Sequence, residues 1–422
     1  MWESFIKDII KGPLISLGKK VLAWWHGYEL QRIEDQIQKA QSALEDQNLY
    51  DFLKWLYPWE NILERQGYIY PVAIFPASES QWNDVESPLL SFKPQMPDDK
   101  DLLIKDTRYR RLMHKLGRPL EDRITYTMSK LVVQDSRLGL ECTLGSYFRA
   151  LDSCDALEWE LLYNWAKVHP EKCDFEKFLT EKLRLRQKLH GIVDNPVRDG
   201  KGRSAAIAIL TLLAFIADGK REPTLWLKLR SRRGVAVHGA LYHVIPSFMF
   251  QPATLYFEEE FSVAHNIYRE YLEEIFNRPE PKEGESEPRY FYNDPCLTDL
   301  LDLLGRRKAQ LFFTGLAVNL LNLRPAICTL LLIKDPNWYK SHSESGPEEL
   351  RIKLNDEWVK NVRELQEIMK RRKEVKAVKI SYSDNDADLI EKGVLRPSQM
   401  VPSGAAAFWL GIDVLRKILN NC

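Results

Sequence analysis

Cysteine is scarce in this chain of 422 residues, and its six occurrences lie far apart. No two of them have the spacing of zinc ligands, and they are too dispersed for the disulfide framework of a small secreted domain. We therefore expect reduced, mostly packed cysteines in a cytoplasmic protein, although the sequence leaves open a bridge between Cys154 and Cys173. The six are Cys142, Cys154, Cys173, Cys296, Cys328 and Cys422.

Long apolar runs and an excess of charge of one sign are also missing. No stretch of about 18 uncharged apolar residues is present, so the sequence predicts no transmembrane helix, and the N-terminal segment lacks the cleavage site of a signal peptide. Sixty basic and sixty acidic residues give a net charge of zero. A neutral chain has no general attraction for nucleic acid, and we expect no specific nucleic-acid partner. P-loop and dinucleotide-binding fingerprints are absent from the sequence as well.

The size and composition indicate a globular protein with a substantial core. The apolar fraction is 45%, and twelve tryptophans are present, while the length predicts two or three domains. Turn-rich stretches at 76–106 and 194–202 suggest boundaries. We divide the chain into an N-terminal helical region, a mixed helix and strand region that packs on the third, and a third region with insertions. These regions are residues 1–95, 96–200 and 201–422.

The first 60 residues have the pattern of helices with a basic and apolar character. Apolar side chains between Phe5 and Leu22 alternate with lysines, and Gly12-Pro13 divides the segment into two short helices. Apolar helical stripes usually face protein, whereas a basic amphipathic helix can also lie on an anionic membrane. We expect residues 1–60 to pack on the rest of the chain or on a second copy of it. A protein partner and peripheral membrane contact are the alternatives.

Three glutamates gather in the segment from Arg269 to Phe276. Residues three and four apart share one face of a helix, so Glu270, Glu273 and Glu274 are expected to project together, opposite an apolar face. Crowded carboxylates repel one another unless a cation lies between them, and Mg²⁺ favours hard oxygen ligands together with a substrate phosphate. The segment predicts a divalent-metal site, with a solvated acidic face as the alternative.

Strand-like segments precede this helix. An apolar run at 205–217 fits a buried strand, residues 223–231 alternate as a half-buried strand does, and residues 239–252 read as a further strand that ends in an Ile-Pro turn and a loop. This order, completed by an Arg-Glu-x-x-Glu-Glu helix, resembles the Nudix superfamily of pyrophosphohydrolases. In that superfamily the helix holds a divalent metal against the diphosphate of the substrate. The helix motif matches at Arg269, Glu270, Glu273 and Glu274.

The resemblance implies a fold, a chemistry and a set of residues. The fold is α/β, of the α+β kind: a Nudix-like α/β/α sandwich with a mixed sheet, preceded by a mainly helical N-terminal region. The chemistry is hydrolysis of a nucleotide or nucleoside diphosphate derivative with Mg²⁺ or Mn²⁺. Arg269 would orient the glutamates by a salt bridge, and the basic segment near Arg230 would bind phosphate. The implied metal-binding and catalytic residues are Glu270, Glu273 and Glu274 with Arg269, and the implied substrate-binding residues are Arg230, Ser231 and Arg232.

The chain departs from the family pattern where the family has glycine. The turn glycine is replaced by Phe248 or, in the other register, by Leu255, and the closing glycine by Phe276. A bulky side chain obstructs the close approach of backbone to phosphate. The alternative function is therefore a catalytically weak or inactive Nudix-like module that senses a nucleotide or binds a protein. Similar divergent domains accompany bacterial signalling systems.

Other patterns complete the expected organisation. His238 and His243, five residues apart in a strand and turn, fall on opposite faces and make a poor metal pair, so we expect core or hydrogen-bonded histidines. The predicted strands are 124–133, 138–147, 309–320, 325–333 and 375–381, and the predicted helices are 156–165, 175–190, 297–304, 348–372 and 405–419.

Overall fold

The computed structural model describes nine segments of the chain. They are residues 28–135, 137–168, 173–217, 222–231, 238–279, 287–359, 380–382, 384–391 and 393–420. Of the sequence predictions, those for residues 1–27, for Arg232, for the end of the predicted helix at 360–372, for most of the predicted strand at 375–379 and for Cys422 lie outside these segments.

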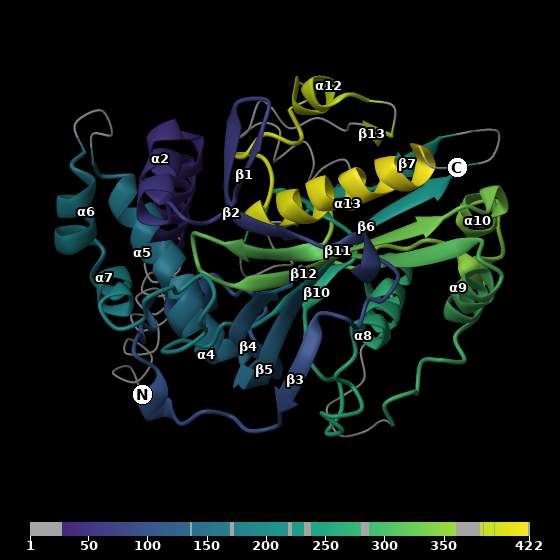
Figure 1. Cartoon of the computed structure of the whole chain (residues 1–422), viewed down its shortest axis with the longest axis horizontal. Helices are drawn as coiled ribbons and strands as arrows, with labels where there is room; N and C mark the ends of the chain where they lie inside the picture. The colour runs from purple at the N-terminus through teal and green to yellow at the C-terminus, as the bar shows by residue number, and fades with distance from the viewer. Residues whose placement is uncertain are drawn as a thin grey trace, which may run out of the picture.

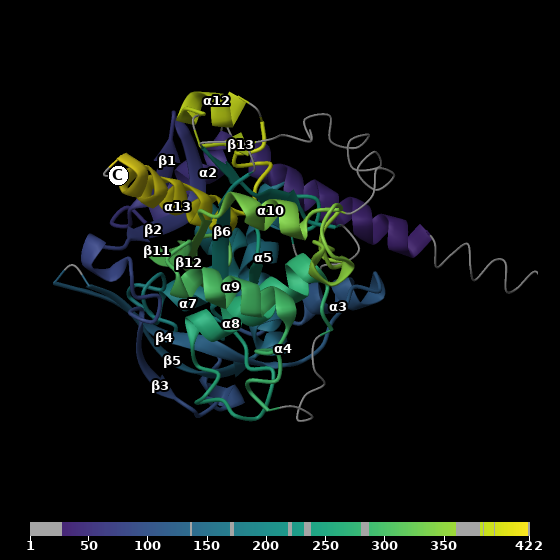
Figure 2. The same cartoon turned by 90° about the vertical axis from the view of Figure 1, so that its right-hand side faces the viewer.

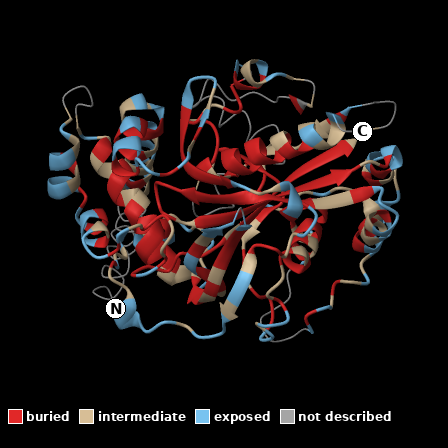
Figure 3. Cartoon of the chain, in the orientation of Figure 1, coloured by how far each residue is buried: buried red, intermediate tan, exposed pale blue. Residues whose placement is uncertain are grey.

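The centre of the molecule is a mixed sheet of eight strands. Its main path runs β1 (Ile62–Arg65), β2 (Tyr68–Pro76), β11 (Ala309–Asn319), β12 (Pro325–Ile333), β6 (Ala208–Ile216), β7 (Pro223–Leu225) and β13 (Ile380–Ser381). The short strand β10 (Ser247–Met249) pairs with the first residues of β6. Neighbours are antiparallel except β12 and β6, which run parallel. The central strands are buried on both faces (Figure 3) and consist of apolar runs, as such strands require.

Helices cover both faces of this sheet. The helix α13 (Pro402–Asn420) crosses one face against β2, β11, β12 and β6. On the other face lie α8 (Val263–Glu270), α9 (Pro295–Gly305) and α10 (Pro336–His342), as Figures 1 and 2 show. The structure therefore confirms a mixed α+β architecture with helices on either side of a mixed sheet. In the described part of the chain, no helix is both long and apolar enough to cross a membrane.

A smaller unit of one sheet and several helices packs beside the main sheet. The sheet contains β3 (Leu89–Lys93), β5 (Arg137–Ser146) and β4 (Ile124–Gln134) in that order. Residues 28–41 are helical. The other helices are α2 (Gln47–Leu56), α3 (Arg108–Lys115), α4 (Tyr147–Ala150), α5 (Ala156–Trp165), α6 (Phe175–Lys182) and α7 (Arg184–His190). One apolar core joins this unit to one face of the main sheet through residues such as Ile209 and Val318.

Several predicted elements need correction. The helix predicted at 175–190 is two helices, α6 and α7, and the strand predicted at 239–252 is two short strands in different sheets. The helical description of residues 1–95 is wrong for 62–76, because β1 and β2 are strands of the main sheet and β2 pairs with β11. The single strand predicted at 223–231 is split at Trp226: β7 pairs with β6, whereas β8 (Leu227–Leu229) pairs with β9 (Tyr242–Val244). The helix predicted at 348–372 is wrong for 351–359, which is extended and bridges Arg230.

The cysteines that the structure describes are free. Four of them are buried, and Cys173 is partly exposed, so the alternative of a Cys154–Cys173 bridge is wrong for this structure. Burial raises the pKa of the Cys154 thiol to about 11, because an apolar environment disfavours the thiolate. These cysteines are therefore packing residues with little nucleophilic character.

Candidate functional site

A cavity of about 610 Å³ opens beside the glutamate helix. Its wall combines residues from β6, β9, β10 and α8, from the turn between β11 and β12, and from the segment before α13. We call it the central cavity. Charged and titratable side chains of both signs line it: Glu121, Glu270, Glu273, Asp356, Glu357, Arg123, Arg230, Arg324, Tyr147, His238 and His243.

The glutamate helix begins where the local sequence supplies caps. Ser262 accepts a hydrogen bond from the backbone N–H of His265, and the carboxylate of Glu86 accepts from the N–H groups of Val263 and Ala264 at 2.8 Å. An acid at a helix N-terminus satisfies donors that have no partner within the helix. The first turn is thereby fixed against β3 and its neighbours, and the helix direction toward the cavity follows.

The helix widens just before the last two glutamates. Residues Tyr271–Ile275 form a π-helical turn, so the spacing of three and four residues no longer places side chains on one face. Glu270 and Glu273 line the central cavity, whereas Glu274 is buried and turns toward β10. The sequence predicted that all three glutamates project together: two of them line the cavity, and Glu274 lies buried next to its wall, bonded to the cavity residue Ser247.

Arg269 pairs with the neighbouring glutamate. Its Nη2 lies 3.0 Å from Oε1 of Glu270, and it also donates to Oδ1 of Asn266 and to the carbonyl of Gln251. Arg269 is 1% exposed and Glu270 is 6% exposed. The ion pair is thus shielded from water, which strengthens the attraction, and it fixes the carboxylate of Glu270 at the cavity wall.

Glu274 lies in an environment that disfavours its charge. Burial raises its pKa well above the usual carboxyl range, and the nearby carboxylates of Glu357 and Glu273 raise the pKa further. Its Oε1 accepts a hydrogen bond from the N–H of Ser247 at 2.9 Å. Its Oε2 is buried with no hydrogen-bond partner among the described residues. Glu274 therefore favours the protonated state or a cation close by.

Arg230 reaches the cavity as the basic segment predicts. Its Nη2 lies 3.0 Å from Oε2 of Glu357, and the backbone N–H of Ser231 donates to the carbonyl of Glu357 at 2.7 Å. Residues 355–359 are held beside β8 by these contacts, which brings Glu357 into the cavity. The side chain of Ser231 is buried beside the cavity and does not line it.

The part of the cavity wall that contains Asn322 and Arg324 was not predicted from the sequence. Arg324 lies 3.1 Å from the buried carboxylate of Asp155. The carboxylate of Glu158, on α5, accepts a hydrogen bond from Nδ2 of Asn322 at 2.7 Å. The same carboxylate lies 2.8 Å from Nε2 of His238. The only sequence signal was the polar turn between two apolar runs that carries Asn322 and Arg324.

Two further residues shape the floor of the cavity. His243 is buried, and burial lowers its pKa well below the usual range, as do the positive charges of Arg230 and His238. Its Nδ1 has no hydrogen-bond partner among the described residues and packs against Gly404, where an added Cβ would lie only 2.9 Å away. Phe248, one of the residues that replace a family glycine, lines the cavity, whereas Phe276 is buried in the core.

Comparison with models of protein families gives no match to this chain, and comparison with curated proteins gives none. Within the described segments, no three His, Cys, Asp or Glu side chains are already gathered in an arrangement that could hold a metal ion. The Nudix resemblance and the metal site therefore stay predictions.

Proposed function

We propose that the chain is a divergent, Nudix-type hydrolase of a nucleoside diphosphate-linked compound. One observation carries the proposal: Glu270 and Glu273 of the helix motif and Arg230 of the basic segment line the same cavity. The sequence motif and the basic segment, which are about 40 residues apart in the chain, thus meet at one place. The mixed sheet with helices on both faces supports the same reading.

The cavity has the size and composition of a ligand site. Its volume of about 610 Å³ lies within the range of roughly 300–1,000 Å³ typical of small-molecule pockets. Arg230 and Arg324 present guanidinium groups, whose forked donors match phosphate oxygens. Phe248 and Met249 supply apolar surface beside them. A compound with phosphates and a flat organic group is the ligand that these walls fit best.

The carboxylates at the cavity wall are candidate ligands of a divalent cation, although no three of them are already gathered around one point in the described segments. Glu270 and Glu273 offer carboxylate oxygens at the cavity wall, and Glu274 has an oxygen without a hydrogen-bond partner among the described residues. A bound Mg²⁺ or Mn²⁺ would neutralise the diphosphate and lower the pKa of water for attack on phosphorus. The repulsion among Glu273, Glu274 and Glu357 is the kind that a cation relieves.

Other residues of the cavity bind the phosphates, orient Glu270 and exclude water. Arg230 and Arg324 hold and orient the phosphates, Arg269 fixes Glu270, and Phe248 excludes water from one side of the cavity. Water attacks a phosphorus atom, the bridging P–O bond breaks, and a nucleoside monophosphate leaves with the other phosphorylated product. The groups lie on elements of the rigid sheet and helices, which favours a positioned substrate.

The second candidate is a nucleotide-binding module without hydrolysis. A specific observation favours it: two of the three glutamates of the motif are already engaged within the protein. Glu270 pairs with Arg269, and Glu274 accepts from the N–H of Ser247. A cation would have to compete with these contacts, and the bulky Phe248 stands where the family has a close approach of backbone to phosphate.

Calorimetric titration with Mn²⁺, together with an assay of product release, tests the proposal. The substrates are ADP-ribose, dinucleoside polyphosphates and nucleoside triphosphates. We expect Mn²⁺ binding that Glu273→Gln weakens by roughly tenfold or more, because a hard cation loses a charged oxygen ligand. The matched control is Glu259→Gln, an exposed acid outside the cavity, which should leave binding unchanged.

Turnover separates the two candidates. Hydrolysis of any of these substrates that Glu273→Gln abolishes supports the enzyme. Nucleotide binding that Arg230→Ala weakens, without turnover in either Mg²⁺ or Mn²⁺, supports the binding module. If neither Mn²⁺ affinity nor nucleotide affinity responds to these substitutions, both proposals are wrong for this cavity.

A further inference from the structure

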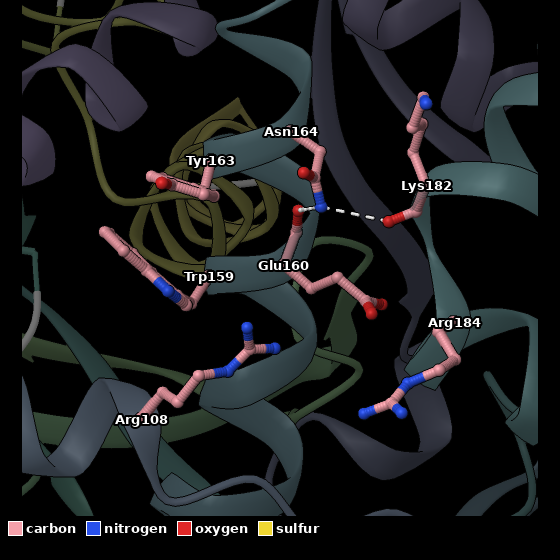
Figure 4. A pocket seen from close by; sticks show the side chains of 7 residues that line it. All are labelled: Arg108, Trp159, Glu160, Tyr163, Asn164, Lys182 and Arg184. Carbon is pink, nitrogen blue, oxygen red and sulfur yellow. Dashed lines mark hydrogen bonds between the residues drawn. The ribbon is translucent and has the colours of Figure 1, made fainter.

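A second hollow, of about 380 Å³, lies on the outer side of α5. Figure 4 shows the side chains around it. Trp159, Glu160, Tyr163 and Asn164 come from α5, Arg108 from α3, and Lys182 and Arg184 from the joint between α6 and α7. We call it the Trp159 hollow.

Positive charge predominates in the Trp159 hollow. Arg108 and Arg184 lie around the carboxylate of Glu160, whereas the ammonium group of Lys182 points away from it (Figure 4) and lies 3.9 Å from Glu181. The carboxylate of Glu160 is buried and accepts backbone N–H groups at the start of α7, at 2.9 to 3.2 Å. Arg184 forms no salt bridge with any described residue, and Figure 4 shows its guanidinium beside the opening. Arg108 pairs with Asp106 at 2.6 Å, so Arg184 is the cation that an anion entering the hollow meets without a salt bridge to any described residue.

Aromatic rings form the other wall. The rings of Trp159 and Tyr163 stack with their centroids 5.1 Å apart and an interplanar angle of 24°, and both side chains are partly exposed. They also border a second depression of about 360 Å³, which shares Arg108 and adds Arg111 and Lys115. Flat aromatic surface beside arginines is the combination that recognises a base and its phosphates, by stacking and by forked hydrogen bonds.

The hollow is one residue away from the wall of the central cavity. Glu158 precedes Trp159 on α5 and contacts His238 and Asn322, which both line the central cavity. The helix that carries Trp159 therefore also carries a residue that contacts two side chains of the central cavity.

We propose that the Trp159 hollow is a second ligand site, which binds a nucleotide with its phosphates between Arg108 and Arg184 and its base against Trp159 and Tyr163. The site is independent of any reaction in the central cavity and does not rest on the function proposed above.

Fluorescence anisotropy of a labelled ATP, titrated with the full chain, tests this site. We expect Arg184→Ala and Trp159→Ala each to weaken binding about tenfold, because each removes a main recognition element. Lys188→Ala is the matched control: Lys188 is exposed on the same short helix as Arg184 and does not line the hollow. Its affinity should stay within about twofold of the unsubstituted chain.

Three results would overturn the proposal. The first is equal affinity of the Arg184→Ala variant and the unsubstituted chain. The second is loss of binding in Arg230→Ala with none in Arg184→Ala, which would move the nucleotide to the central cavity. The third is a single-stranded oligonucleotide that binds more than about tenfold tighter than ATP, which would make this face a nucleic-acid surface. Because Arg184 is exposed, its variant keeps the fold and the comparison stands even if Trp159→Ala does not fold.

Discussion

The central cavity and the Trp159 hollow differ in how far their arginines are paired with acids and shielded from water. In the central cavity, Arg324 and Arg230 are paired with acids and largely shielded from water. In the Trp159 hollow, Arg184 lacks a salt bridge with any described residue, and the side chain of Arg108 is 60% exposed although it pairs with Asp106. The paired arginines of the central cavity stabilise the fold in addition to any ligand that they bind, whereas Arg184 of the Trp159 hollow is available to a ligand alone. Substitutions should therefore cost stability in the central cavity and leave stability nearly unchanged at Arg184.

The largest effect is expected for Arg324→Ala. Removing one partner of a buried pair leaves the other charge uncompensated, which costs about 3–5 kcal/mol. Burial already raises the pKa of Asp155, and Arg324 is the group that lowers it. Without Arg324 the pKa of Asp155 rises further above its unfolded value. Stability is then lost as pH rises, and urea denaturation should show a larger deficit at pH 8 than at pH 5. An equal deficit at both pH values would contradict this account.

A smaller effect is expected for Glu260→Ala, on the loop that leads to the glutamate helix. Glu260 is fully buried and accepts from the N–H groups of Ala253 and Thr254, at 2.6 and 2.9 Å, and from the hydroxyl of Thr254. Losing the acceptor leaves buried donors without partners, at a cost of roughly 2–3 kcal/mol. Thermal denaturation measures it, with the exposed neighbour Glu259→Ala as the control. A change no larger than that of the control would show that the loop tolerates the loss.

Glu274→Gln should have a modest effect on stability, and its main effect should be on how stability depends on pH. Because the folded pKa of Glu274 is raised, its contribution is fully present below the ordinary carboxyl pKa and is lost as pH rises through the folded value. A neutral glutamine keeps an acceptor for the N–H of Ser247 and removes the charge. We expect the variant to melt higher than the unsubstituted chain at pH 8, with the difference closing toward pH 4. A variant that melts lower at pH 8 would mean that a cation, or a partner, already stabilises the carboxylate.

The smallest effect on stability is expected for Arg184→Ala. Exposed charges without a fixed partner contribute little to folding, so the change should stay within about 0.5 kcal/mol. The same urea denaturation as for Arg324→Ala gives a direct comparison of the two arginines. A loss of about 2 kcal/mol or more in the free energy of unfolding would show that Arg184 stabilises the fold. The central cavity and the Trp159 hollow would then not differ in this respect.

The sequence predicted the individual strands and helices better than it predicted how they pair. The apolar runs at 309–320 and 325–333 are β11 and β12, because buried strands need continuous apolar residues and a polar turn between them. The glutamate helix and Arg230 were found by motif and charge. The pattern does not say which strands pair, so the partnership of β2 with β11 and the parallel pairing of β12 with β6 became visible only in the structure.

The remainder of the site depends on contacts between distant segments. The π-helical turn that contains Glu273 and Glu274 breaks the regular helix on which the three-and-four spacing depends. Glu357 joins the cavity because residues 355–359 run beside β8, where a helix had been predicted. His243 and Asn322 look like ordinary core and turn residues until β9 and the turn after β11 are brought together.

One buried arginine has a consequence for the order in which the protein folds during synthesis. Arg186 is completely buried, and its guanidinium donates to the hydroxyl of Tyr57 and to the carbonyls of Leu320 and Leu321. Those carbonyls lie 134 and 135 residues further along the chain. During synthesis, α7 leaves the ribosome long before its acceptors exist, and a buried cation without acceptors is costly. The helices of the first half therefore complete their folding only when the hairpin of β11 and β12 has emerged, and the nascent chain matures as a whole.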